Sequence, residues 1–373
     1  TFTALLIPLL AIAFQVLPAK QAFADFANPV IFLFMGGFAL AAALTRHGID
    51  RDIGQSVLKV AGTHPRRAAY LLFVATGAMS MWISNTATAA MMLPVALGVA
   101  SRFDDPQHRT ALFLLLGTAY AASIGGMATL VGSPPNAIAA ASQSITFVQW
   151  LKFGMPLALL LMPLMIALLQ WLLKPDFTLL PEATSSREPS SSKPVARDRK
   201  RTFTLLIFAA VVSGWIFSGP LSALTGIVKE FDAWVAVAGM LALGLSGAIK
   251  WEDAEKKTSW GILLLFGGGM TLSTVLEQTG TSVFIAAQLK DLVQNAPALL
   301  AILVMVGFIV FLSELVSNTA AAALLIPLLV PVSAHFGLPP MVLAVVVALA
   351  ASSSFMLPVA TPPNAIVFGT GLI

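Results

Sequence analysis

The sequence predicts an all-α polytopic membrane protein made of two inverted-topology repeats. Hydrophobic residues make up 58% of its 373 residues and charged residues only 10%, whereas about a quarter of the residues in a soluble domain are charged. Apolar runs near the length of a membrane span recur along the whole chain. Three motifs also recur in the same order in the two halves. We therefore expect each repeat to contain a re-entrant helical hairpin and a broken transmembrane helix.

The three repeated motifs define the duplication. The first half contains Phe34-Met-Gly-Gly, Ser84-Asn-Thr-Ala and Pro134-Pro-Asn-Ala-Ile, and the second contains Phe266-Gly-Gly-Gly, Ser317-Asn-Thr-Ala and Pro362-Pro-Asn-Ala-Ile. Corresponding motifs lie 232, 233 and 228 residues apart. Three motifs in one order at nearly one offset indicate an internal repeat.

The repeats are expected at 1–173 and 202–373, joined by a linker at 174–201. The linker is rich in Pro and Ser and carries seven Lys or Arg residues against four Asp or Glu residues, so we expect it to be flexible and cytoplasmic. The chain begins inside one apolar run and stops inside another. We therefore expect the first repeat to be truncated at its start and the second at its end.

The basic stretch 46–67 sets the expected orientation of the spans. Its apolar residues Ile49, Ile53, Val57 and Val60 recur at helical spacing, which favours an amphipathic helix at the membrane interface over an ordinary basic loop. With this stretch and the linker in the cytoplasm, span 29–45 runs inward. Its counterpart 261–276 follows the inner loop 250–257 and runs outward, so the repeats are inverted.

The segments 68–100 and 298–331 are expected to be the re-entrant hairpins. From Ala68 to Ile83 there are 16 residues, which extend about 24 Å as a helix. A full crossing needs about 30 Å. Two short helices that meet at a polar tip fit this length better than two tilted spans, which remain the alternative.

Each hairpin tip carries three consecutive polar residues, Ser84-Asn85-Thr86 and Ser317-Asn318-Thr319. Polar side chains in lipid are costly unless they have partners. Hydrogen bonds between packed helices are one possible role. The duplication favours another: Ser, Asn and Thr cap helix N-termini, and these caps with the free N–H groups behind them bind anions.

The broken helices are expected at about 110–142 and 341–373. Each contains a Pro-Pro-Asn sequence, and proline interrupts a helix because it lacks an N–H donor. We expect Asn136 and Asn364 to cap the half-helices that follow. A break of this kind exposes carbonyl groups, which bind Na⁺, and N–H groups, which face carboxylates. No Lys or Arg lies in these motifs, so co-bound cations are the natural complement of an anionic substrate.

Two other features have separate interpretations. Glu314 lies deep in an apolar run, where it either tunes a cation site or forms an ion pair that stabilises the hairpin. The two Phe-led glycine motifs are interpreted as sites of close helix packing.

The residue types exclude several classes of function. There are no cysteines, which excludes disulfides and thiolate chemistry. The four histidines do not cluster in the sequence as metal ligands would. The polar residues at membrane depth offer no nucleophile–base pair, so an enzyme is not expected.

The paired Ser-Asn-Thr and Pro-Pro-Asn motifs, and the stretch Met81-Trp-Ile-Ser-Asn-Thr-Ala-Thr-Ala-Ala-Met-Met-Leu-Pro, resemble the divalent-anion/sodium symporter family over nearly the whole chain. The resemblance implies eleven spans, two re-entrant hairpins, a homodimer and an elevator-like transport domain in the plasma membrane. Relative to that pattern, the chain would lack about two spans at its start and one at its end.

The resemblance also implies roles for individual residues. The substrate carboxylates would be held by Ser84, Asn85, Thr86, Ser317, Asn318, Thr319 and Thr361. One sodium ion would lie among Ser80, Ser84, Asn85 and the backbone of Gly132, and a second among Ser313, Asn318 and the backbones of Val316 and Ala360. Ser133 and Ser313 stand where the family often has threonine. The implied activity is sodium-coupled symport of C4 dicarboxylates. The alternatives are a sodium-independent dicarboxylate exchanger and a sulfate transporter.

Overall fold

The regular elements of the residues that the structure describes are all helices, which confirms the predicted all-α fold. The structure is a computed structural model that describes residues 2–49, 52, 53, 56, 60, 64–103, 108–178, 199–227, 230–281, 284, 288 and 298–373. Most of the predicted linker (179–198) and much of the predicted interfacial helix, including Val57, lie outside these residues.

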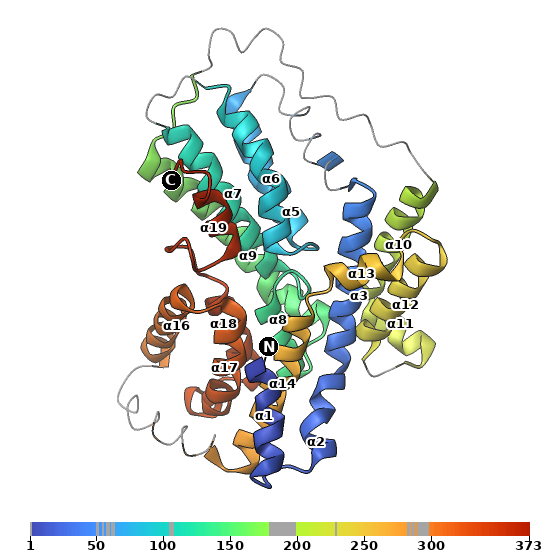
Figure 1. The fold of residues 1–373 in the computed structure, drawn as a ribbon. Helices are drawn as coiled ribbons and strands as arrows, with labels where there is room; N and C mark the ends of the chain where they lie inside the picture. Colours follow the sequence, from blue (N-terminus) through green and yellow to red (C-terminus); the bar gives the residue numbers. More distant parts are fainter. Residues whose placement is uncertain are drawn as a thin grey trace.

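The helices follow the chain in two series (Figure 1). The first series is α1 (Phe2–Ala13), α2 (Ala19–Ala24), η1 (Asp25–Ala27), α3 (Pro29–Arg46), α5 (Pro65–Ser80), α6 (Asn85–Ala100), α7 (Arg109–Ala128), α8 (Pro134–Gln143) and α9 (Phe147–Leu173). The second is α10 (Arg199–Ile216), α11 (Ser218–Thr225), α12 (Phe231–Leu245), α13 (Trp251–Lys257), α14 (Trp260–Gln278), α16 (Ala298–Leu315), α17 (Asn318–Leu329), η3 (Val330–Phe336), α18 (Pro340–Ala351) and α19 (Pro362–Phe368).

Four helical segments among the described residues are long and apolar enough to cross a membrane: 19–46, α7, α9 and α14. A fifth results if α10 and α11 count as one span, although the chain turns by 88° between them. The signal for the turn is Ser218-Gly219-Pro220, because proline favours the first turn of a new helix.

Glycines let two pairs of helices approach closely. A Cβ atom on Gly36 of α3 would lie 2.5 Å from the carbonyl oxygen of Ala236 in α12, and one on Gly268 of α14 would lie 2.5 Å from that of Ala4 in α1. The predicted packing role of the glycine motifs is confirmed. The two glycines are 232 residues apart, and so are the two alanines. Corresponding residues therefore make the same contact, each time between the two halves of the chain.

Polar contacts gather the basic stretches at one end of the molecule. Arg46 at the end of α3 pairs with Asp253 of α13, and Arg201 at the start of α10 pairs with Asp52. His47 hydrogen-bonds to the carbonyl of Ala248, at 2.9 Å. Partly exposed ion pairs contribute at most about 1 kcal/mol to stability. These pairs are therefore more informative about the topology than about the stability of the protein. They show that the stretches that begin at residues 46, 199 and 250 share one end.

Candidate functional site

The two Ser-Asn-Thr motifs lie at the turns between α5 and α6 and between α16 and α17. Ser84 caps α6 by accepting a hydrogen bond from the Ala87 N–H at 3.3 Å, and Ser317 caps α17 by accepting one from Ala320 at 3.2 Å. The predicted capping role of both motifs is therefore confirmed. The helices α5 and α6 have 16 residues each, or about 24 Å, which is short of a crossing of about 30 Å.

The first tip is held by a hydroxyl and by a glycine. The hydroxyl of Ser80, at the end of α5, donates to Asn85 Oδ1 at 2.7 Å. Gly126 of α7 leaves the space for that oxygen, because a Cβ atom there would lie 2.2 Å from it. Thr86 and Ser84 are exposed, and Asn85 is half-buried. The structure thus brings the predicted ligands Ser80 and Asn85 together beneath an open tip.

The second tip has the same plan with one additional side chain. Ser313 of α16 is fully buried, and Asn318 begins α17 with its side chain half-buried. Ser354, which follows α18, donates its hydroxyl toward Ser313 Oγ at 2.7 Å and Asn318 Oδ1 at 3.0 Å. The sequence analysis gave Ser354 no role in the site. At this tip Thr319 is half-buried, and Ser317 and Val316 are exposed.

The Pro-Pro-Asn motifs break two helices as expected, but their asparagines do not cap the helices that follow. Asn136 lies inside α8, and its amide donates back to the carbonyl oxygens of Gly126 and Thr129 at 2.9 and 2.7 Å. Asn364 likewise donates to Ser354 and Leu357, at 3.4 and 3.1 Å. The capping prediction is wrong because the two prolines occupy the first turn of each following helix, so the asparagine lies inside that helix and its amide donates back to carbonyls of the break.

Other residues of the breaks have different surroundings. The cap of α19 is Thr361, whose buried hydroxyl accepts from the Asn364 N–H at 3.3 Å. Gly132 is buried and packs closely on Gly126, since a Cβ atom on it would lie 2.6 Å from the Gly126 oxygen. Ala360 is also buried. These positions lie in the breaks themselves, as the expected sodium ligands must.

The half-helix that follows each break packs against the other half of the chain, so the two halves exchange these half-helices. Helix α19 packs against α6 and α7, and α8 packs against α17 and α18, an arrangement that can be followed in Figure 1. The hydroxyl of Tyr120 in α7 also donates to the carbonyl of Phe355 in the second break, at 2.8 Å. Each hairpin is thus joined to the broken helix of the other half.

Glu314 is buried against the second break. Its two carboxylate oxygens accept hydrogen bonds from the backbone N–H groups of Met356 and Leu357, at 2.9 and 2.8 Å, and the residue is only 2% exposed. None of the described residues forms an ion pair with it. Among these residues its partners are main-chain donors, through which Glu314 holds the second break against α16.

The site is otherwise free of formal charge. The sequence has no charged residue between Arg67 and Arg102 or between Arg109 and Lys152, and after Asp291 Glu314 is the only one. Hydroxyl, amide and main-chain groups are therefore the available ligands for a charged solute.

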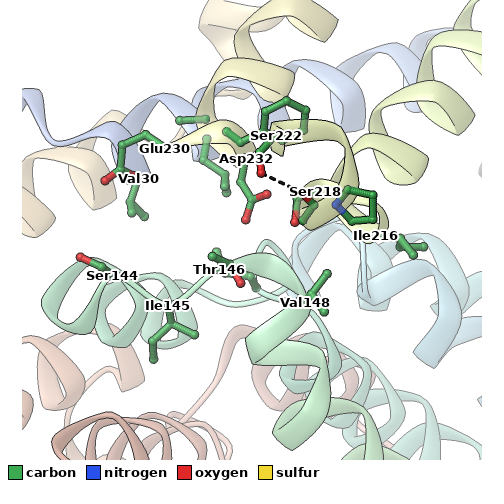
Figure 2. Close-up of a pocket in the computed structure, with 16 residues that line it drawn as sticks. Val30, Ser144, Ile145, Thr146, Val148, Ile216, Ser218, Ser222, Glu230 and Asp232 are labelled. Carbon is green, nitrogen blue, oxygen red and sulfur yellow. Dashed lines mark hydrogen bonds between the residues drawn. The ribbon is translucent and has the colours of Figure 1, made fainter. Parts of the chain in front are cut away.

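A separate cavity of about 480 Å³ lies between the start of α3, the turn from α8 to α9, α11 and the start of α12 (Figure 2). It is lined by Glu230 and Asp232 but by none of the predicted site residues. Asp232 is buried and accepts the Phe147 N–H at 2.7 Å. The sequence analysis did not identify Asp232, because this residue stands at the start of an apolar run, where a carboxylate is not conspicuous.

Comparisons with known proteins agree on one family. Residues 1–350 match the citrate transporter family. An uncharacterised transporter of Haemophilus influenzae is 44% identical over 100% of this chain and 81% of its own length. The sodium-dependent dicarboxylate transporter SdcS of Staphylococcus saprophyticus is 33% identical over 96% of this chain and 74% of its own length.

A solved structure supports the same fold. The YdaH transporter of Alcanivorax borkumensis, whose crystal structure has an unusual topology, aligns with a TM-score of 0.69 over 97% of this chain and 82% of its own length, at 17% identity. The resemblance that the motifs indicated is confirmed, and the protein is an integral membrane transporter rather than an enzyme. The chain belongs to the citrate transporter family, of the divalent-anion/sodium symporter type.

Proposed function

We propose that this protein is a secondary active transporter that carries C4 dicarboxylates, such as succinate, malate and fumarate, together with sodium ions. The observation that carries the proposal is the doubled constellation of a Ser-capped helix N-terminus, an oxygen cluster at its asparagine and a broken helix from the opposite half. The name of the relative SdcS, a sodium-dependent dicarboxylate transporter, supports the same solutes.

The anion would be held without basic side chains. The N-termini of α6 and α17 each present roughly half a positive charge, or about one in total. A dicarboxylate carries about two negative charges, and Glu314 adds one nearby. About two further positive charges are needed for neutrality, and two sodium ions would supply them. We assign the carboxylate contacts to Ser84, Asn85 and Thr86 at the first tip and to Ser317, Asn318 and Thr319 at the second, with Thr361 at the second break.

The neutral oxygens fit sodium as a co-transported ion. Hard cations prefer hydroxyl, amide and carbonyl oxygens, and broken helices expose such groups in transporters. We assign one ion to Ser80, Ser84, Asn85 and the Gly132 backbone, and the other to Ser313, Asn318 and the backbones of Val316 and Ala360. The close approach of Ser80 Oγ to Asn85 Oδ1, at 2.7 Å, supports the first assignment.

The transport cycle is proposed to use an elevator motion in a homodimer. The repeated contacts at equal offsets and the exchanged half-helices support two repeats, 1–173 and 202–373, of inverted topology with two re-entrant hairpins. We place the protein in the plasma membrane. The linker 174–201 is proposed to be cytoplasmic, since basic residues concentrate on that side.

Uptake into proteoliposomes tests this function. We expect labelled succinate to accumulate when an inward sodium gradient is imposed, and to stop accumulating when potassium replaces sodium. Uptake that requires internal dicarboxylate but not sodium would instead identify an exchanger. Uptake of sulfate that succinate does not inhibit would identify an inorganic-anion transporter.

A further inference from the structure

The two asparagine tips differ at one corresponding position. In the first half, Gly126 lies against Asn85 Oδ1, and no side chain would fit there, since a Cβ atom would be 2.2 Å from that oxygen. The corresponding residue of the second half, 228 positions later, is Ser354. It is fully buried, and its hydroxyl oxygen lies 2.7 Å from Ser313 Oγ and 3.0 Å from Asn318 Oδ1. The second tip therefore has three side-chain oxygens where the first has two.

These three oxygens can all present lone pairs to a cation. Ser313 already donates its proton to the Val310 carbonyl at 2.8 Å, and an amide oxygen is only an acceptor. The proton of Ser354 has an alternative acceptor in the Ala351 carbonyl, at 3.3 Å. When it turns there, the oxygens of Ser313, Asn318 and Ser354 are free to face one ion. Neutral hydroxyl and amide oxygens suit a hard cation.

The local charge also favours a cation at the second tip over the first. Glu314, next to Ser313, holds a buried negative charge at the second break through two main-chain N–H groups. The corresponding residue of the first half is Met81, whose main-chain carbonyl accepts from the Thr129 hydroxyl. The first break is thus tied to its hairpin by neutral groups, and the second by a carboxylate.

We propose that the hydroxyl of Ser354 is a direct ligand of the sodium ion at the second tip, and that this site consequently binds sodium more tightly than the first. The proposal rests on the proposed function, since it names a further ligand of a co-transported ion. It predicts that the second site fills first as sodium rises, and that the first site limits uptake only when Ser354 is intact.

The experiment compares three variants in proteoliposomes. Ser354→Ala removes the oxygen, and Ser354→Cys keeps the shape but supplies sulfur, a poor ligand for a hard cation. Ser352→Ala is the matched control, because its buried hydroxyl donates only to the Ala348 carbonyl one helical turn earlier, at 2.9 Å. For each, the sodium concentration at half-maximal succinate uptake and the KM for succinate at saturating sodium are measured. Sodium-dependent thermal stabilisation without succinate gives a second measure of ion binding.

The expected result for Ser354→Ala and Ser354→Cys is a rise of about fivefold in the sodium concentration that half-maximally stabilises the protein without succinate, the effect of about one lost polar contact at the tighter site. The half-maximal sodium concentration for uptake should rise by less, because the first site limits uptake in the unmodified protein. The KM for succinate at saturating sodium and the behaviour of the control should not change. A normal sodium response of Ser354→Cys, or an equal rise in the KM for succinate, would overturn the proposal, and Ser354→Cys decides if Ser354→Ala is misfolded. Uptake by the unmodified protein that does not respond to sodium would refute the proposed function itself.

Discussion

Replacement of Asn136 by leucine tests the role of the buried amides in the broken helices. The amide of Asn136 is fully buried and donates to two carbonyl oxygens at 2.9 and 2.7 Å. Leucine has the same branching and the same number of side-chain heavy atoms but no donor, so the Gly126 carbonyl would lose this hydrogen bond and the Thr129 carbonyl would keep only the longer one from the Gly132 N–H, at 3.3 Å. A buried carbonyl without a partner costs about 2 kcal/mol and a lost second hydrogen bond about 1 kcal/mol, or roughly 3 kcal/mol for the two.

An opposing effect reduces this cost. Asn136 Oδ1 is itself buried without a hydrogen-bond partner in the described residues, and removal of that oxygen returns about 2 kcal/mol. The net loss is therefore about 1 kcal/mol, which lowers the Tm by roughly 2–4 °C at the 2–4 °C per kcal/mol of larger domains.

The corresponding change in the second break gives the comparison. The amide of Asn364 makes longer hydrogen bonds, at 3.4 and 3.1 Å, and its Oδ1 is also unpartnered. Asn364→Leu should therefore lower the Tm less than Asn136→Leu does. Gln143→Leu is the control, because that amide donates only to its neighbour Ser142 at the end of α8. Thermal unfolding of the purified variants in detergent is the assay. A larger loss for Asn364→Leu, or none for Asn136→Leu, would refute the reasoning.

Three further predictions concern the tips, the helix packing and the topology. Asn85→Ala and Asn318→Ala should each abolish sodium-driven succinate uptake in correctly folded protein, because each amide serves an ion and a carboxylate; near-normal uptake by both would contradict the site. Gly36→Ala should cost about 1–3 kcal/mol by overpacking, seen as a lower Tm, whereas Gly98→Ala, whose Cβ atom would meet nothing within 4 Å, should not destabilise the protein. A cysteine in place of Ser191 should resist an impermeant reagent added outside intact cells; its labelling there would reverse the proposed topology.

The features that the sequence predicted are those that depend on neighbouring residues. Serine caps were expected at Ser84 and Ser317 because cap preference is local, and both caps are present. Close packing at Gly36 and Gly268 was expected because a missing side chain permits it wherever a partner helix passes. The duplication was visible because corresponding residues keep nearly one offset.

The features that the sequence could not predict depend on contacts between distant segments. The direction of the Asn136 amide follows from which carbonyls the break exposes, and the partners of Glu314 are main-chain groups some 42 residues away. The role of Ser354 required a comparison with Gly126 in space.

The two tips and the two breaks are proposed to bind a dicarboxylate and its sodium ions together. The most direct measurement is an electron cryo-microscopy map of the protein with sodium and succinate. We predict density for the succinate carboxylates at the capped starts of α6 and α17, with ion density beside Asn85 and Asn318. Succinate density in the cavity lined by Glu230 and Asp232, with none at the tips, would contradict it.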